Sequence, residues 1–166
     1  DFVWCNGVLH HTKNPYEAFK KILPRLKKNG YIFIGLYNKI GRFRTKFRKY
    51  IYKIFGKKLL IKIDPVLRNI SYTNQDKINA WIKDQYTHPV ENTHTFDEVL
   101  RWFKMNNIEF VSSIPEISPF NNATKNIFEK NSKATFIERI LQQFIMIFSS
   151  FGAEGGVFLF TGRKLN

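Results

Sequence analysis

The sequence contains only one cysteine, Cys5, among 166 residues. A single cysteine cannot form a disulfide within the chain, which excludes a disulfide-stabilised scaffold and suits a reducing cytosol. The sequence also lacks an uninterrupted apolar run of the roughly 18 residues that a transmembrane helix needs. Charged and amide side chains interrupt the best candidate, residues 136–151. We therefore expect a cytoplasmic protein with no transmembrane segment.

Acidic residues are absent between Lys39 and Lys62, a segment with ten lysines and arginines in a chain whose formal net charge is +14. Apolar residues recur there at three- and four-residue spacing, which predicts a basic amphipathic helix. They are Ile40, Phe43, Phe47, Tyr50, Ile51 and Ile54. We expect Arg42, Arg44 and Arg48 on its exposed basic face.

Three interpretations of this basic helix stay open. It is a lid whose apolar stripe packs on the domain while its basic face is solvated, or its charges attract an anionic substrate or membrane surface. Nucleic acid is the third candidate partner, and it is disfavoured because no aromatic- and glycine-rich RNA motif accompanies the charge.

The first 38 residues predict a strand, a helix and a second strand. A β-prone apolar run covers Phe2–Asn6, a helical pattern covers Tyr16–Lys28, and Tyr31–Tyr37 has the composition of a strand buried on both faces. Elements in this order form one right-handed unit of a parallel sheet. Ligands of parallel sheets bind outside the carboxyl ends of the strands. We therefore expect a site built from the loops at 5–12 and 37–41.

Several motifs in this stretch are characteristic. Residues 1–11 read Asp-Phe-Val-Trp-Cys-Asn-Gly-Val-Leu-His-His, Asn14-Pro15 precedes the helix, and Leu26-Lys-Lys-Asn-Gly30 precedes the second strand. They resemble the fourth and fifth strands of class I S-adenosylmethionine-dependent methyltransferases, whose last motif usually reads Leu-Lys-Pro-Gly-Gly. Asn29 fits there because asparagine tolerates the left-handed conformation of a helix C-cap. Residues 155–164 are similar to the family's closing strand.

The resemblance implies a fold. It is a Rossmann-like three-layer α/β/α sandwich, partial here, with a mostly parallel sheet, an antiparallel last strand and a helical insertion. From one edge, the implied strand order is Ile108–Ile114, Gly156–Gly162, Tyr31–Leu36 and Phe2–Asn6. The first strand would then form an apolar, unpaired edge that makes the protein sticky.

The sequence has no Gly-x-Gly-x-x-Gly loop. In this family such a loop lies on the first strand, upstream of the motifs present here, and cradles the amino-acid end of the cofactor. We therefore expect a fragment, inactive alone, of a methyltransferase domain. Its expected division is a core βαβ unit at 1–38, a basic helical lid insertion at 39–95, a helix–strand unit at 96–117, a second insertion at 118–150 and the final strand at 151–166.

Periodicity and capping residues predict three further helices. One covers Asn74–Lys83. The next starts at Thr95, with a capping box that pairs Thr95 with Glu98, and ends at Asn106-Asn107. The third covers Ala134–Ser149, and its broad apolar stripe is expected to be buried against the sheet or the lid.

The resemblance also implies a function, methyl transfer from S-adenosyl-L-methionine, and places Cys5, Asn6 and Gly7 beside the methionine portion of the cofactor. Asn6 is the main candidate and Gly7 would let the backbone approach closely; alternatively, Asn6-Gly7 is only a turn. His11, and after it His10, are candidate bases because imidazole accepts a proton near neutral pH. A histidine in this loop can instead cap the next helix or bond a backbone carbonyl. No metal site is expected, since the histidines lack supporting ligand spacing.

The candidate substrate contacts are Tyr37, Asn38, Tyr86, His88 and Glu91. The last three belong to an Asp-x-Tyr-x-His-Pro-x-Glu string that is similar to a segment of a bacterial subgroup of these methyltransferases. Alternatively, a Tyr, a His and an Asp of this string satisfy one another's hydrogen bonds between two helices. The expected acceptor is a small molecule, a lipid precursor or a saccharide. The alternatives are an RNA or protein acceptor, or a non-catalytic methyltransferase-like binding module.

Overall fold

The computed structural model describes residues 1–70, 74–122, 126–149 and 155–165. Parts of the expected segments 39–95, 118–150 and 151–166, namely 71–73, 123–125, 150–154 and 166, lie outside these ranges. The chain forms two compact units. Unit 1 comprises Asp1–Arg42 and Val90–Asn166, and unit 2 comprises Phe43–Pro89. Along the chain, unit 2 therefore separates two parts of unit 1.

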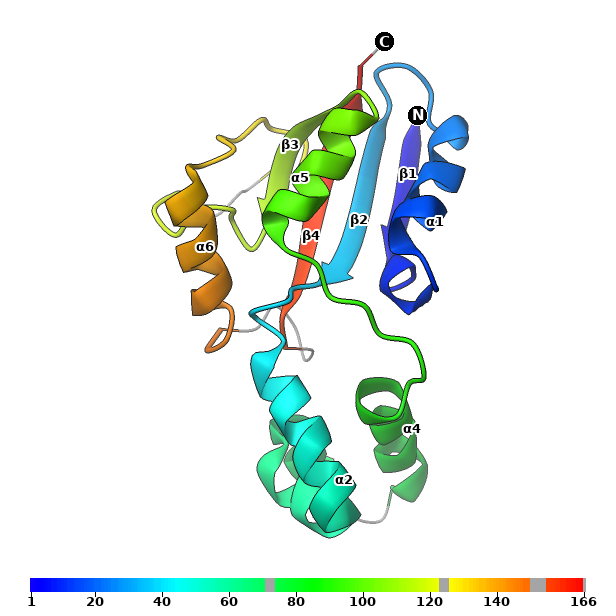
Figure 1. Cartoon of the computed structure of the whole chain (residues 1–166), viewed down its shortest axis with the longest axis vertical. Coiled ribbons are helices and arrows are strands. Elements are labelled where there is room, and N and C mark those ends of the chain that lie inside the picture. Colours follow the sequence, from blue (N-terminus) through cyan, green and yellow to red (C-terminus); the bar gives the residue numbers. More distant parts are fainter. Residues whose placement is uncertain (71–73, 123–125, 150–154, 166) are drawn as a thin grey trace. The chain divides into compact units, whose positions relative to one another are not determined.

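Unit 1 is built on a four-stranded sheet with the order β1-β2-β4-β3 (Figure 1). The strands are β1 (Phe2–Asn6), β2 (Tyr31–Tyr37), β3 (Ile108–Ile114) and β4 (Val157–Lys164). Strands β1 and β2 run parallel, whereas β4 runs antiparallel to both β2 and β3. The predicted strand order and antiparallel final strand are confirmed, and with them the Rossmann-like α/β fold.

Helix α1 (Pro15–Ile22) connects the two parallel strands. The predicted helix, Tyr16–Lys28, is too long, because a 3₁₀ turn, η2 (Leu23–Arg25), replaces its second half. Pro24 has no N–H to donate to the carbonyl four residues earlier, so the α-helical pattern cannot continue through it. Asn29 has a φ of 62°, and its expected left-handed conformation is therefore confirmed.

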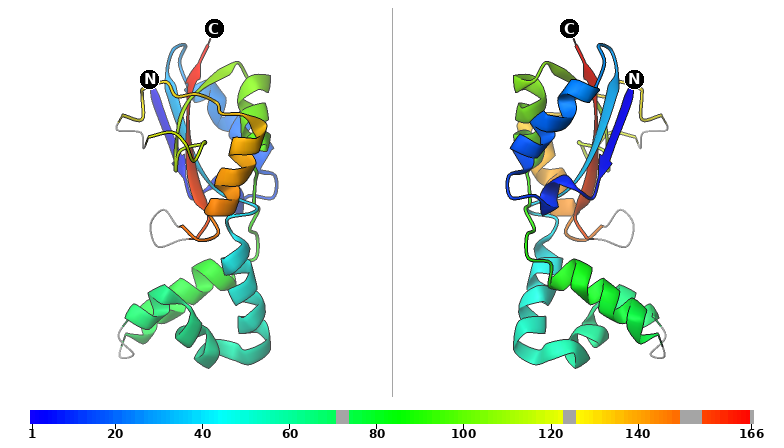
Figure 2. Two further views of the ribbon diagram at one scale, coloured as in Figure 1. Left: turned by 90° about the vertical axis from the view of Figure 1, so that its left-hand side faces the viewer. Right: turned by 90° about the vertical axis from the view of Figure 1, so that its right-hand side faces the viewer.

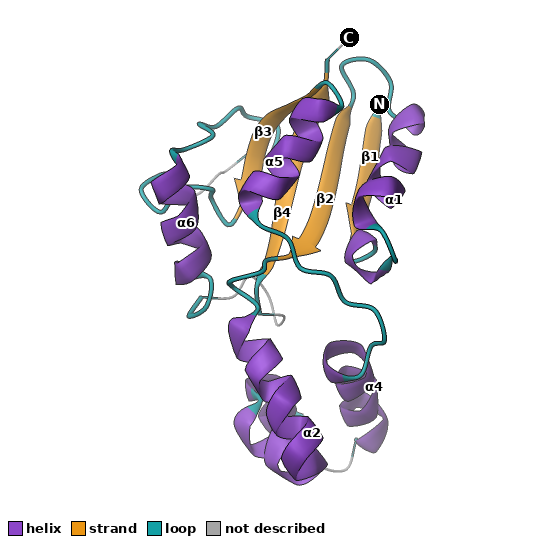
Figure 3. Cartoon of the chain, viewed as in Figure 1, coloured by secondary structure: helices purple, strands orange, loops and turns teal. Residues whose placement is uncertain are grey.

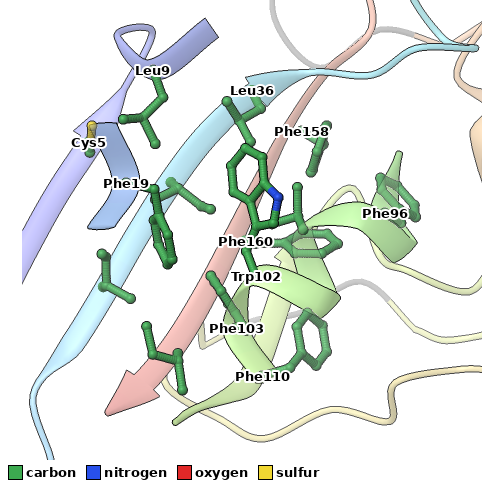
Figure 4. Close-up of a cluster of buried hydrophobic side chains, with 14 of the residues drawn as sticks. Cys5, Leu9, Phe19, Leu36, Phe96, Trp102, Phe103, Phe110, Phe158 and Phe160 are labelled. Carbon is green, nitrogen blue, oxygen red and sulfur yellow. The ribbon is translucent and has the colours of Figure 1, made fainter. Parts of the chain in front are cut away.

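Helices α1 and α5 (Phe96–Met105) cover the same face of the sheet (Figures 1 and 2). Side chains alternate between the faces of a strand, so β2 directs Ile32, Ile34 and Leu36 into the core beneath these helices. Figure 4 shows the aromatic part of this core, which consists of Phe19, Phe96, Trp102, Phe103, Phe110, Phe158 and Phe160. The core thereby fixes both parallel strands, whose carboxyl ends form the expected site.

The opposite face of the sheet is also apolar. Within the described residues, the Phe128 ring covers Phe33 of β2 with its centroid 5.8 Å away. Phe2 and Trp4 of β1 remain 50% and 55% exposed. Because β1 is the edge strand, the predicted apolar edge is confirmed. Such an edge favours association with further polypeptide.

Thr95 is the N-cap of helix α5, as predicted, but the capping box is incomplete. The Thr95 hydroxyl accepts a hydrogen bond from Glu98 N at 3.2 Å. The Glu98 carboxylate is paired with His94 Nδ1, 2.9 Å away, which draws it from the Thr95 backbone. The helix ends at Met105 with Asn106 as its C-cap, in agreement with the prediction.

Helix α6 (Phe136–Ile145) presents its apolar side to solvent. The prediction that this stripe is buried is wrong, since Ile137 is 76% exposed while Gln143 is buried. Gln143 Oε1 accepts hydrogen bonds from Asn38 Nδ2 at 2.9 Å and from Phe96 N at 3.1 Å. These buried donors need a polar partner, and α6 therefore turns its amide side inward.

Unit 2 contains α2 (Phe43–Ile63), α3 (Pro65–Asn69) and α4 (Gln75–Tyr86), so the helix predicted at Asn74–Lys83 continues to Tyr86. Their apolar core consists of Leu60, Leu67, Ile78, Ile82 and Tyr86. The buried Asp64 lies between α2 and α3. Its carboxylate caps α3 by accepting hydrogen bonds from Val66 N and Leu67 N. It also joins α4, because it accepts hydrogen bonds from Trp81 Nε1 and the Tyr86 hydroxyl.

The basic helix begins later than the charge pattern predicts. Helix α2 starts at Phe43, and Arg42 is fully buried in unit 1. The prediction that Arg42 lies on the exposed basic face is therefore wrong. The residues before it form a turn in which Asn38 Oδ1 accepts hydrogen bonds from Ile40 N at 3.0 Å and Gly41 N at 2.8 Å. This turn directs Arg42 into unit 1.

Candidate functional site at the carboxyl ends of two strands

The expected site edge is present in unit 1. Asn6 ends β1 and is followed by Gly7, while Tyr37 ends β2 and is followed by Asn38. Because the two strands are parallel neighbours, their carboxyl ends, and with them these four residues, lie at the same edge of the sheet. Figure 3 shows both strand ends at this edge. The short turn η1 (Leu9–His11) follows β1 and brings the two adjacent histidines to this edge.

Asn6 lies over Gly35 of the neighbouring strand. A Cβ atom added to Gly35 would be 1.8 Å from Asn6 Oδ1, so a glycine is needed there for Asn6 to adopt this position. Gly7 has a φ of 74°, and nothing lies within 4 Å of where its Cβ would be. The pair therefore offers an exposed carboxamide and an unobstructed backbone.

Cys5, the third predicted cofactor contact, points to the other side of the strand. Its side chain is buried in the core cluster that also contains Leu9. Burial raises the pKa of the Cys5 thiol, so the thiol is neutral at physiological pH. The Cys5 side chain thus points into the core, on the opposite side of β1 from the Asn6 side chain.

His10 is stacked within the site. Its ring centroid lies 4.0 Å from that of Tyr37 and 4.2 Å from that of His11. The side chain is 2% exposed, and neither ring nitrogen has a hydrogen-bond partner among the described residues. Burial, together with the nearby His11 and Arg42 charges, lowers the pKa of His10 to about 3. A neutral imidazole with so low a pKa is a weak proton acceptor at pH 7.

This low pKa makes stability depend on pH. Below pH 6.5 the His10 imidazole is protonated in the unfolded chain while it stays neutral in the folded protein. Unfolding is therefore favoured increasingly as the pH falls, and we expect a loss of about 1–2 kcal/mol between pH 7.5 and pH 5. His10→Phe, which keeps an aromatic ring against Tyr37, should abolish this part of the loss. Urea unfolding at each pH measures it.

The matched control is Asn122→Leu, an exposed substitution that removes no titratable group. This variant should show the same pH dependence as the wild-type protein. Equal slopes for His10→Phe and wild type between pH 7.5 and pH 5 would contradict a buried neutral His10.

His11, the preferred candidate base, is half-buried and held by a backbone carbonyl. Its Nδ1 lies 2.9 Å from Val90 O. Since a carbonyl only accepts, Nδ1 carries the hydrogen in the neutral ring, which leaves the lone pair on Nε2. The sequence leaves two structural roles open for a histidine in this loop, and a hydrogen bond to a backbone carbonyl is one of them. It also fixes the orientation that a base would need.

Arg42 is a central residue of this edge that the sequence prediction missed. Its Nε and Nη2 donate to Glu91 Oε1 and Oε2, both at 3.1 Å, and its Nη1 donates to Gly155 O at 3.1 Å. Its guanidinium carbon lies 3.4 Å from the centroid of the Tyr37 ring. The bidentate pair neutralises two buried charges and holds Tyr37 between neighbours.

The five predicted substrate contacts fall in three places. Tyr37 and Glu91 belong to the cluster around Arg42. Asn38 is fully buried and bonded to Gln143 and to its own turn. Tyr86 and His88 belong to unit 2, where the Tyr86 hydroxyl bonds Asp64 and the pKa of Tyr86 is raised by burial.

Metal ligands and membrane spans were also sought in the described part of the chain. No group of three or more His, Cys, Asp or Glu side chains there could hold a metal ion. None of the described helices is both long enough and apolar enough to cross a membrane.

The last strand, β4, runs antiparallel between β2 and β3, and loops lie at the carboxyl ends of the parallel pair. This is the arrangement implied by the resemblance to class I S-adenosylmethionine-dependent methyltransferases. A family model described as "Methyltransferase domain" matches residues 1–34, from β1 into β2. The resemblance is thus confirmed: the chain has the fold of these methyltransferases, and its opening stretch matches the model of a methyltransferase domain.

Solved structures support the same fold. The structure of PKMT2 from Rickettsia typhi in complex with AdoHcy matches with a TM-score of 0.66 and 14% identity, covering 100% of this chain and 36% of that one. A second structure of PKMT2 from Rickettsia typhi matches with a TM-score of 0.61 and 11% identity, covering 98% of this chain and 34% of that one. The chain spans about a third of the length of these proteins. A comparison with curated proteins found no match.

Proposed function

We propose that the chain is part of an enzyme that transfers a methyl group from S-adenosyl-L-methionine to an acceptor. The observation that carries this proposal is the Asn6-Gly7 pair at the carboxyl end of β1, within the stretch that matches a methyltransferase domain. Asn6 offers an exposed amide with donors and an acceptor, and Gly7 leaves its backbone accessible. Both suit the polar amino-acid end of the cofactor.

Little catalytic machinery is demanded of the chain. The bound cofactor supplies an activated methyl group together with its leaving group, so the protein mainly positions the acceptor. We assign Asn6 and Gly7 to cofactor binding and His11 to orienting the acceptor or removing its proton through Nε2. His10 contributes an uncharged wall, because its low pKa keeps it neutral.

The proposed acceptor is a small molecule, a lipid precursor or a saccharide. The groups gathered at the edge are either neutral and aromatic, like His10 and Tyr37, or neutralised by each other, like Arg42 and Glu91. Such an environment suits an acceptor without a strong charge. The burial of Asn38 and Glu91 favours a positioning role for these two over direct contact with the acceptor.

The test is cofactor affinity in the full-length protein. Asn6→Leu is isosteric but cannot make hydrogen bonds, and we expect it to weaken S-adenosylhomocysteine binding about 10- to 100-fold, the effect of losing one or two buried hydrogen bonds. Isothermal titration calorimetry measures the affinity.

The control is Asn122→Leu, which replaces an exposed asparagine in the segment after β3. This variant should bind the cofactor product like wild type. Unchanged affinity in Asn6→Leu would remove Asn6 from the site. No detectable binding by the wild-type full-length protein would instead favour a non-catalytic binding module.

A further inference from the structure

Helix α2 carries an exposed row of large apolar side chains. Phe43, Phe47, Tyr50 and Ile54 are 60%, 57%, 63% and 54% exposed. Their spacing of four, three and four residues places them on one side of the helix. We call these four residues the aromatic stripe.

The opposite side of α2 serves the core of unit 2. Thr45 is buried, and Tyr52 packs against the core with its ring centroid 6.4 Å from that of Tyr86. Residues 45 and 52 lie about half a helical turn from the aromatic stripe. Tyr52 thus faces the core of unit 2, and none of the four residues of the aromatic stripe belongs to that core.

Positive charge borders the aromatic stripe. Lys46 and Lys53 lie along one side of it and Arg44 along the other, and all three are exposed. The sequence from Lys39 to Lys62 contains ten lysines and arginines and no acidic residue. The surface therefore combines a continuous apolar row with a local excess of cations.

An occupant of this surface must cover apolar side chains and supply negative charge at the same time. A contiguous exposed apolar row marks an interaction site. A nucleic acid would meet the cations through its phosphates but would leave the helical row of Phe and Ile side chains in water. An anionic bilayer provides both, because its headgroups carry phosphates and its acyl chains begin a few ångströms below them.

We propose that the part of α2 before its break at Gly56 docks on an anionic phospholipid surface, with the axis of this part in the plane of the membrane. The aromatic stripe enters the boundary between headgroups and acyl chains, and Arg44, Lys46 and Lys53 face the lipid phosphates. This is peripheral binding by one side of a helix, and it does not depend on the methyl transfer proposed above.

Cosedimentation of the full-length protein with vesicles tests this proposal. We compare vesicles of pure phosphatidylcholine with vesicles that also contain about 30% phosphatidylglycerol, which mimic an anionic leaflet. We expect binding to the anionic vesicles that weakens at high salt, and little binding to the neutral ones. Absence of binding to the anionic vesicles would overturn the proposal.

Two variants separate the apolar from the charged contribution. Phe47→Ser/Tyr50→Ser should lower the vesicle affinity at least tenfold, because two large side chains no longer enter the bilayer. Lys46→Gln/Lys53→Gln should lower it about 25-fold, since each cation near an anionic surface contributes about fivefold. Circular dichroism checks that both variants remain folded, which their exposure favours.

The matched controls lie outside α2. Phe120→Ser removes an aromatic side chain that is 74% exposed, and Lys21→Gln/Lys28→Gln removes two exposed cations. Both should bind vesicles like wild type. If Phe47→Ser/Tyr50→Ser also binds like wild type, or if every lysine pair matters equally, the attraction is only a property of the net charge and the proposal is wrong. The proposal is also wrong if a DNA duplex displaces the wild type and Phe47→Ser/Tyr50→Ser equally and completely from the anionic vesicles.

Discussion

Arg42→Met is expected to lower the free energy of unfolding by about 3–5 kcal/mol, the usual cost of breaking a buried ion pair. Arg42 is fully buried and the Glu91 side chain is only 8% exposed, so the substitution leaves a largely buried carboxylate without its ion-pair partner. It also removes the donor to Gly155 O and the cation stacked on Tyr37. Urea unfolding followed by circular dichroism measures the loss.

Two further variants show whether the unpaired charge causes the loss. Arg44→Met removes an exposed arginine two positions away and should change stability by less than about 0.5 kcal/mol. Arg42→Met/Glu91→Leu removes both charges and should recover at least half of the lost stability. If the double variant is less stable than Arg42→Met, the ion pair is not the reason that Arg42 matters.

Gly156→Ala should cost about 2–4 kcal/mol, within the range for a side chain forced into a strained, crowded position. Gly156 has a φ of 77°, and an added Cβ would lie 2.5 Å from Arg42 N and 2.7 Å from Gly41 C. These are backbone atoms, which cannot rotate away. The turn before Arg42 would have to move, and with it the hydrogen bond from Asn38 N to Gly156 O. The same unfolding measurement applies.

Gly56→Ala separates crowding from backbone strain. Gly56 has a similar φ of 73°, but nothing lies within 4 Å of its Cβ position. Only the backbone strain is then penalised, at about 1–3 kcal/mol, because a φ of 73° with a ψ of −169° is a conformation that almost only glycine adopts. Equal losses for the two variants would show that the close approach of Gly156 to the Arg42 turn does not contribute.

The sheet could be predicted from the sequence because its signals are local. Each strand is a short β-prone run, and each is bounded by turn residues such as Asn6-Gly7 and Asn106-Asn107. The order of the strands does not follow from periodicity at all. It came from the family resemblance, which residues 1–34 and the fold bear out.

The errors arose where orientation depends on distant partners. The apolar spacing of α6 correctly identifies a helix, but only the buried donors of Asn38 and Phe96 explain why Gln143 faces inward. Charge spacing groups Arg42 with the cations of α2, because it does not reveal the turn that precedes Arg42. Its contact with Glu91 crosses 49 positions of sequence. The one available signal was an acidic residue in the string that resembles a methyltransferase segment.

The pairing of Arg42 with Glu91 has a topological consequence. Arg42 is the last residue before unit 2, and Glu91 comes one residue after the chain returns to unit 1. Hydrogen bonds from Lys39 N to His94 O and from His94 N to Tyr37 O join the same two strands of chain at 2.9 and 2.8 Å. The points of departure and return are thus fastened together within unit 1 itself. The helices of unit 2 can therefore change in length or sequence during evolution without breaking the contacts that join the two parts of unit 1.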